Sequence, residues 1–202
     1  MRSEFIQAIK THQSVFGREL PDDAIERLAD YFDLIVEHNP ILHLVGPGSP
    51  EEFATRHILE SLTLLEYLPE NTRFADVGAG AGLPSIPCLL VREDLKAILI
   101  ESKEKKSKFL KLAVEQLKLK YRTRIAAQQF QEADLAHSQA VTCRALDKFT
   151  EKLPGLIKWS AGSNMLLFGG DNLRSALQNA KLRFDENLMP MSERRFLFIV
   201  AR

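Results

Sequence analysis

Three glycines follow an acidic residue in the segment FADVGAGAGLPSIP. Gly78, Gly80 and Gly82 allow the backbone to take positive φ values and to approach a ligand closely. Pro84 and Pro87 stiffen the approach to a helix start, where backbone amides point outward. Such a segment can cradle a phosphate, hold a nucleoside or simply make a tight turn.

The spacing of this glycine loop separates these ligands. The dinucleotide fingerprint G-x-G-x-x-G needs a third glycine at position 83, which is Leu83, and the chain has G-x-G-x-G instead. Asp76 precedes the loop, and a second apolar run, KAILIE, ends in Glu101, where an acid can accept both hydroxyls of a ribose. This arrangement favours an S-adenosylmethionine methyltransferase, with the amino-acid part of the methyl donor on the loop. A dinucleotide enzyme and a plain structural turn are the alternatives.

The elements that must position these residues alternate between strands and helices from residue 73. Strands are predicted over RFADVGAG, KAILIE, RIAAQQF, AVTCRA and NMLLFGG, and a final pair over LRF and RRFLFIVAR. Helices are predicted over IPCLLVRE, KEKKSKFLKLAVEQLKL and residues 171–182. The pattern predicts an α/β, Rossmann-like methyltransferase fold, a mostly parallel seven-stranded sheet with helices on both faces.

Residues 1–70 are expected to form a helical N-terminal extension, and residues 71–202 the methyltransferase domain. One helix starts at Pro21 and is expected to end at Asn39 and Pro40. A second helix starts at Ser49, which can cap it together with Glu52.

Composition narrows the class of protein further. The 202 residues are 45% hydrophobic and 27% charged, with 27 Lys and Arg against 27 Asp and Glu, which is typical of an ordinary globular protein. The two cysteines, Cys88 and Cys143, lack metal-site spacing and fit a reducing compartment. No signal peptide or membrane span is expected, so we expect a cytoplasmic protein that binds neither membrane nor metal.

Four motifs together resemble one family. DVGAGAGLPSIP followed by ESKEKKSKFL, with RHILES upstream and CRAL downstream, is similar to the RsmG/GidB family of bacterial small-subunit ribosomal RNA methyltransferases, over nearly the whole chain. The resemblance implies methyl transfer from S-adenosylmethionine to nitrogen 7 of one guanine in 16S ribosomal RNA. The expected partner is this RNA or a small-subunit assembly particle, and the protein is expected to be a monomer.

The resemblance also implies site residues. Glu101 stands where the family has its ribose-binding acid, Gln129 and Phe130 border the adenine, and Arg144 lies beside the methyl donor. The expected cofactor-binding residues are Asp76, Gly78, Ala79, Gly80, Gly82, Leu83, Pro84, Glu101, Ser102, Gln129, Phe130 and Arg144. The chain departs from the family pattern at Gly169, where a lysine is usual, at Gln128, where an arginine is common, and at His43, where the family has asparagine.

An RNA-binding side is expected from basic residues and from the upstream and late motifs. Its expected members are Arg56, His57, Lys103, Lys105, Lys106 and Arg194. Nine Lys or Arg fall between Glu101 and Arg124, which indicates either the solvated face of a helix or contacts to phosphates. Replacing Lys103, Lys105 and Lys106 by Glu is expected to weaken RNA binding and to spare cofactor binding.

The chemistry expected of these residues is simple. Guanine nitrogen 7 has a free lone pair, so alignment suffices and no general base is needed. Arg144 is expected to position the reactants, and its structural alternative is a salt bridge to Asp147. His57 is expected to be a structural hydrogen-bonding residue, and Cys143 a small buried residue rather than a nucleophile. A non-catalytic RNA-binding or ribosome-assembly protein, and a methyltransferase for a small molecule or a protein, are the competing functions.

Overall fold

The computed structural model describes residues 1–144, 146 and 148–201, and every structural statement below concerns these residues. Seven strands form one sheet in the order β3-β2-β1-β4-β5-β7-β6. Strands β1 to β5 are parallel, and β7 runs antiparallel to both β5 and β6. The strands are β1 (Arg73–Val77), β2 (Lys96–Ile100), β3 (Thr123–Ala126), β4 (Ala140–Arg144), β5 (Asn164–Gly169), β6 (Asp185–Leu188) and β7 (Phe196–Val200). The predicted Rossmann-like sheet is confirmed.

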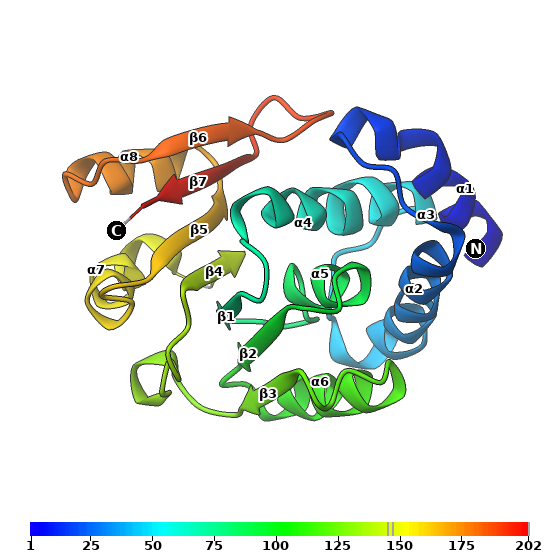
Figure 1. The fold of residues 1–202 in the computed structure, drawn as a ribbon, viewed down its shortest axis with the longest axis horizontal. Helices are drawn as coiled ribbons and strands as arrows, with labels where there is room; N and C mark the ends of the chain where they lie inside the picture. The colour runs from blue at the N-terminus through cyan, green and yellow to red at the C-terminus, as the bar shows by residue number, and fades with distance from the viewer. Residues whose placement is uncertain (145, 147, 202) are drawn as a thin grey trace.

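Helices cover both faces of this sheet (Figure 1). On one face α5 (Ser85–Val91) and α6 (Glu104–Gln116) pack with the N-terminal helices, and on the other lie α7 (Phe149–Trp159) and α8 (Asp171–Asn179). Strand β1 is buried on both faces. Phe74 packs into one hydrophobic core, and Ala75 and Val77 pack into the other. A strand buried on both faces reads as a continuous apolar run, as the sequence does here.

The N-terminal extension packs on the sheet as part of the first of these cores. It consists of α1 (Arg2–His12), the 3₁₀ turn η1 (Gln13–Phe16), α2 (Asp22–Leu42) and a composite helix over residues 50–67. Phe5 stacks on Phe32 with ring centroids 4.6 Å apart, and Phe53 tilts against the Phe32 ring at 5.2 Å. Because the same core continues to Leu89 and Leu99, the extension and the sheet fold around shared apolar contacts. The boundary at residue 70 stays a prediction.

The composite helix changes its winding along its length. It begins as α3 (Pro50–Glu52), where Ser49 and Glu52 form the predicted capping box, with the Ser49 oxygen accepting from the Glu52 amide at 3.1 Å. It continues as a π-helical segment, η2 (Phe53–Leu59), and then as α4 (Glu60–Leu62) and the 3₁₀ turn η3 (Thr63–Tyr67). Insertions of this kind within α-helices are frequent at functional sites, and η2 carries Arg56 and His57.

Among the elements of the structure, two differ from their predicted bounds and one helix was not predicted. Helix α2 continues through Pro40 to Leu42, because a proline in the last turn costs only one intrahelical hydrogen bond and His43 closes the helix with φ 47°. The sixth strand lies at 185–188 and not at LRF, because its exposed, charged residues carry no apolar alternation. Helix α7 has no counterpart among the predicted elements, since Pro154 and Gly155 interrupt its pattern.

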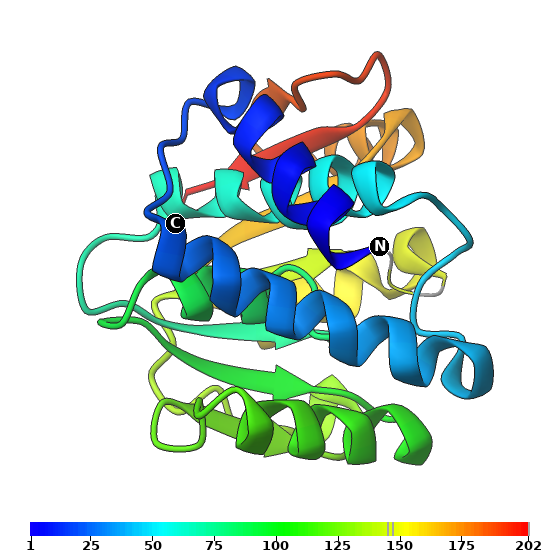
Figure 2. The ribbon, with the colours of Figure 1, turned by 90° about the vertical axis from the view of Figure 1, so that its right-hand side faces the viewer.

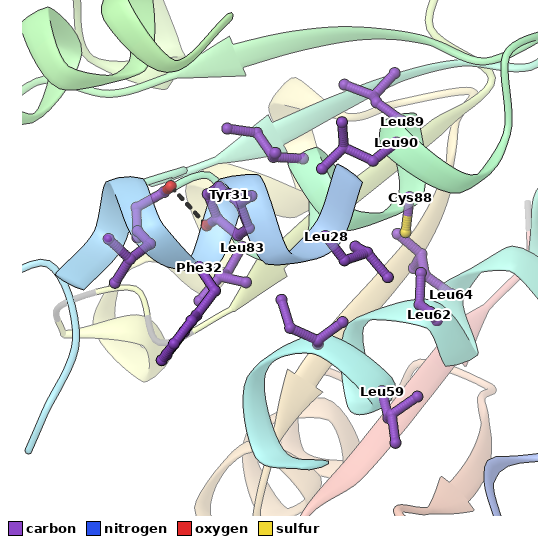
Figure 3. Packing of buried hydrophobic residues seen from close by; sticks show 14 of the residues in the cluster. Leu28, Tyr31, Phe32, Leu59, Leu62, Leu64, Leu83, Cys88, Leu89 and Leu90 are labelled. Atoms are coloured by element: carbon purple, nitrogen blue, oxygen red, sulfur yellow. Dashed lines mark hydrogen bonds between the residues drawn. The ribbon is translucent and has the colours of Figure 1, made fainter. Parts of the chain in front are cut away.

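One buried hydroxyl joins the extension to the glycine loop. Tyr31, on α2, is fully buried and donates a hydrogen bond to the carbonyl of Ala81 at 2.9 Å (Figure 3). Leu28, one turn earlier, packs into the same cluster as Leu62, Leu64 and Cys88. Helix α2 therefore holds the glycine loop through Ala81, on the side of the loop that faces away from the carboxyl ends of the strands.

We expect Tyr31→Phe to lower the free energy of unfolding by about 1–3 kcal/mol, because the buried Ala81 carbonyl loses its donor. The change should also weaken S-adenosylmethionine binding, since the loop loses a fixed point. Urea unfolding and calorimetric titration measure the two effects. Tyr121→Phe is the matched control, because the Tyr121 side chain is exposed. Equal stability of the two variants would contradict this role for Tyr31.

Candidate active site

The predicted site residues follow successive parallel strands at one edge of the sheet. The glycine loop follows β1, Glu101 follows β2, Gln129 and Phe130 follow β3, and Arg144 ends β4. The strand order reverses between β1 and β4, and open α/β sheets bind ligands at such a switch point beyond the carboxyl ends of the strands. In Figure 2 the arrowheads of β1 and β2 point to the same side of the molecule as the end of α2.

The glycine loop has the backbone that its composition predicts. Gly78, Gly80 and Gly82 have φ values of 72°, 56° and 96°, a region that side chains rarely adopt. The amides of Gly78 and Ala79 both donate to the carbonyl of Ile100, at 2.9 and 3.1 Å, and so tie the loop to the end of β2. The conformation of the loop is therefore set by its glycines and by its hydrogen bonds to the end of β2.

Glu101 is directed at this loop. Its side chain is buried, and its two oxygens accept from the backbone amides of Gly80, at 3.0 Å, and Lys103, at 2.7 Å. Each carboxylate oxygen has a second lone pair, so the group can also accept a pair of ligand hydroxyls. The predicted acid thus lies against the predicted loop.

A first cavity of about 270 Å³ opens between these elements. Six of the predicted cofactor residues line it: Gly78, Gly80, Glu101, Ser102, Gln129 and Phe130. Five others, Asp76, Ala79, Gly82, Leu83 and Pro84, lie outside its lining, all of them buried or half-buried in the strand and the loop behind it. Leu146 also lines the cavity, and its Cδ1 would lie 2.8 Å from a Cβ at Gly78.

Asp76 lies beneath the loop as a buried carboxyl. Its Oδ2 accepts from the Ser85 hydroxyl at 2.6 Å, and its Oδ1 has no hydrogen-bond partner in the part of the chain that the structure describes. Burial, with a contribution from Glu101, raises the pKa of Asp76 from 3.8 to about 7, against the lowering effect of Ser85. Asp76 therefore lies outside the lining of the first cavity, and its side chain holds Ser85, which follows the glycine loop.

Arg144 lies in a second cavity of about 520 Å³, whose lining shares Leu146 with the first. Its guanidinium pairs with Glu60 at 3.0 Å, donates to the carbonyl of Arg56, and lies 5.4 Å from the Phe168 ring centroid. Burial is the main cause that lowers the pKa of Arg144, with Glu60 opposing it. Asp147, its alternative partner from the sequence, lies outside the described residues.

Two residues of this cavity, Glu60 and Arg195, are not among the predicted site residues. Glu60, in the motif RHILES, is 1% exposed and pairs with both Arg144 and Arg195, the latter at 2.7 Å. Arg195 directly follows Arg194, the residue that the sequence predicts for the RNA side. Arg194 is exposed and lines none of the three cavities at this end of the molecule. An acid within the motif RHILES was the available signal, but only the fold shows which late arginine pairs with it.

His57 lines the second cavity. The sequence predicts that it is a structural hydrogen-bonding residue, and the described part of the structure shows no such bond at Nδ1. Its buried Nδ1 has no hydrogen-bond partner among residues 1–144, 146 and 148–201, and its ring packs on Phe53 with centroids 5.2 Å apart. Burial and the charges of Arg144 and Arg56 lower the pKa of His57 to about 4, so the imidazole is neutral near pH 7.

The basic stretch divides into two groups. Lys103 and Lys106 line the first cavity and Lys105 is exposed beside them, whereas Arg122 donates to the carbonyls of Leu89, Arg92 and Leu95 at the opposite end of α6. Helix α6 has 13 residues and is about 20 Å long, so its length separates the two groups. Two of the three lysines of the triple Glu variant line the first cavity, and the expectation that this variant spares cofactor binding stays a prediction.

The remaining candidates from the sequence are Cys143 and Gly169. Cys143 is fully buried in the core, and burial raises the pKa of its thiol, as expected of a structural residue. Gly169 lines the second cavity, where a Cβ would lie 2.6 Å from Leu173 Cδ2. Across the described part of the chain, no cluster of three His, Cys, Asp or Glu could hold a metal, and no helix is long and apolar enough to cross a membrane.

Solved structures place the fold in a class. A protein of the NADB-Rossmann superfamily from Streptococcus agalactiae superposes with a TM-score of 0.60 at 16% identity, over 70% of this chain and 67% of that one. TYW2 from P. horikoshii, in complex with MeSAdo, gives 0.58 at 15% identity, over 71% and 62%. These likenesses show a Rossmann-like fold.

Sequence relatives identify the family within that class. A family model described as rRNA small subunit methyltransferase G matches residues 24–188, and the chain belongs to this family. Ribosomal RNA small subunit methyltransferase G of Sorangium cellulosum is 33% identical over 76% of this chain and 67% of its own length. The protein of that name from Xanthomonas campestris pv. campestris (strain B100) is 35% identical over 78% and 71%, and that from Azoarcus sp. 38% over 48% and 45%. The matches thus span about half to two thirds of the relatives.

We expect Asp76→Asn to change how stability depends on pH. With a raised pKa, the native carboxyl keeps a proton that the unfolded chain releases, so its stabilising contribution is present below about pH 4 and lost as the pH rises through about 7. The amide cannot ionise, and the variant should therefore lose less unfolding free energy than the wild type between pH 5 and 8. Urea unfolding at a series of pH values measures this difference.

The control for this comparison is Asp185→Asn, a change at an exposed position of β6. Its stability profile should run parallel to that of the wild type. If Asp76→Asn also runs parallel, Asp76 is ionised throughout and the interpretation is wrong.

Proposed function

We propose that this protein transfers a methyl group from S-adenosylmethionine to nitrogen 7 of a guanine in 16S ribosomal RNA. The observation that carries the proposal is the pairing of two cavities at the switch point, one with the glycine loop and Glu101, the other with Arg144. Family membership supports the RNA substrate. The proposal includes action as a cytoplasmic monomer, on free 16S RNA or on a small-subunit assembly particle.

The residues of the first cavity fit the methyl donor. The free lone pairs of Glu101 suit the two ribose hydroxyls, and the Phe130 side chain offers an apolar wall for the adenine. The Nζ of Lys106 would lie 4.0 Å from a Cβ at Gly80, close enough to the loop to meet the carboxylate of the donor. These assignments place the sulfonium end towards Leu146, which lines both cavities.

The reaction requires no general acid or general base among the side chains. The donor supplies an electrophilic methyl group. The lone pair of nitrogen 7 forms the new N–C bond while the S–C bond breaks, so that a positive charge passes from sulfur to the base and no proton is transferred. The protein has to hold the two atoms in line. Arg144, fixed by Glu60 and by the carbonyl of Arg56, can orient the base, and the neutral imidazole of His57 adds no charge where the product becomes cationic.

The lining of the second cavity suits a planar base. Phe149, Phe168 and Phe196 supply aromatic surface, and Arg144 and Arg195 supply donors for a carbonyl such as guanine O6. Enzymes that act on a base within a folded nucleic acid take it out of the stack into a pocket. The volume of the cavity, about 520 Å³, is in the range of ligand sites.

A non-catalytic RNA-binding protein is the second candidate, and one observation favours it. Gly169 occupies the position of the usual family lysine, and Leu173 fills the adjoining space, with its Cβ 2.9 Å from where a Cβ at position 169 would lie. A lysine cannot simply be restored there without moving Leu173. Leu173 thus occupies the space next to position 169 that a longer side chain would enter.

Two measurements test the proposal. Calorimetric titration with S-adenosylmethionine should show binding, and its absence in a folded protein would defeat every enzymatic function. Mass analysis of 16S RNA from cells with and without the gene should show one guanine that loses a methyl group when the gene is absent. An unchanged RNA mass would reject this substrate while leaving donor binding intact.

We expect Glu101→Gln to weaken S-adenosylmethionine binding roughly tenfold or more, because hydrogen bonds to a charged group are worth about 1.5–3 kcal/mol. The amide keeps the size of the side chain but loses charge and accepting capacity. Titration calorimetry measures the change. Glu104→Gln is the control, since Glu104 is exposed and lies outside the lining of the first cavity. Equal affinities for the two variants would remove Glu101 from the donor site.

We expect Lys106→Ala to reduce donor affinity severalfold and Lys105→Ala to leave it unchanged. Lys106 lines the first cavity near Gly80, whereas Lys105 is exposed and does not. The neighbouring positions make this a matched pair, and the same titration serves both. A loss in both variants would point to the general field of the helix start and not to a contact of Lys106.

A further inference from the structure

A third cavity, of about 450 Å³, lies in the N-terminal extension, and His57 is the lining residue that it shares with the second cavity. The end of α2, the loop over residues 43–49 and the π-helical segment η2 enclose it. Phe32, Ile35, Val36 and Phe53 form its apolar wall. A mostly apolar cavity with a few polar groups at its rim is the usual form of a site for an organic ligand.

The polar rim offers hydrogen bonds with little net charge. It is formed by Asn39, His43, Arg56 and His57. The Arg56 guanidinium pairs with Glu52 at 3.2 Å, and Glu52 also lines the cavity, so that cation is compensated. A phosphate subsite needs uncompensated cations, whereas neutral donors and acceptors such as amides can bind the edge of a base.

The third cavity shares one lining residue with the second. His57 lines both, and its buried Nδ1 is one of the polar atoms that lack a hydrogen-bond partner within the described ranges. The end of α2 also lies on the side of the molecule to which β1 and β2 point, in the blue and green ribbons of Figure 2. Because the two linings share His57, a nucleotide next to one held in the second cavity would lie near the third.

We propose that the third cavity binds the nucleobase of the unpaired nucleotide next to the target guanine. The inference rests on the proposed function and adds a second subsite to it. The base enters against Phe53 and Val36, and its edge meets the rim at Asn39 and His57. The two cavities together require that target and neighbour both be unstacked, so the enzyme reads a single-stranded segment and not a duplex.

Two variants that fill the cavity test this subsite. Val36→Trp places an indole against the apolar wall, and Gly46→Trp adds one at the rim, where a Cβ has nothing within 4 Å and the backbone φ is not positive. Val15→Trp is the control, since Val15 is 55% exposed and lines none of the three cavities. The probe is unmethylated 16S RNA from cells that lack the gene.

Both filling variants should raise KM for the RNA roughly tenfold or more, which is the loss expected when one base no longer stacks. The Kd for S-adenosylmethionine and the dependence of RNA binding on salt should stay as in the wild type, because neither the donor nor a phosphate is involved. Val15→Trp should match the wild type in all three measurements.

An unchanged KM in both filling variants would overturn the inference. A shallower salt dependence in them would also overturn it, by showing that the cavity holds a phosphate. Failure of the proposed function is distinguishable, because the wild type would then leave the RNA unmethylated. In that case RNA binding by wild type and variants, measured directly without the donor, makes the same comparison for the subsite.

Discussion

The buried carboxylate of Glu60 constrains the arrangement of the candidate active site. A buried charge is costly unless it is paired and hydrogen-bonded, and removing one partner leaves the other uncompensated. Glu60 is 1% exposed and is held between Arg144 of β4 and Arg195 just before β7. Three segments far apart in the chain, the composite helix, the fourth strand and the final hairpin, are thereby kept together around the second cavity.

The extension takes part in the site as directly as the sheet does. Tyr31 on α2 holds the glycine loop from behind through Ala81, and the carbonyl of Arg56 on η2 accepts from Arg144. Since one hydrophobic core runs from Phe5 to Leu99, the extension cannot shift without moving the first strands. The glycine loop and Arg144 thus both depend on helices that precede the sheet.

The sequence predicts the parts of this site whose physical cause is local. Glycines with positive φ, an acid at the end of a buried strand and a capping box at Ser49 each follow from a few adjacent residues. The pairing of Glu60 with Arg195 could not be predicted, because it joins residues across the whole fold, and Arg194 has the same charge one position earlier. Helix α7 was missed for the opposite reason, since the local signals of Pro154 and Gly155 were overruled by the packing of Leu153 and Leu156.

The wide turn of η2 gives the composite helix room for an additional residue. A π-helical turn closes its hydrogen bonds between residues i and i+5, whereas an α-helical turn closes them between i and i+4. Each residue of Phe53–Leu59 therefore accounts for less rotation than the roughly 100° of an α-helical residue, so the added residue is absorbed within the wider turn and the flanking turns keep nearly the same phase. The same helix can thereby present Phe53 to the rings of Phe5 and Phe32 near its start and Glu60 to Arg144 near its end.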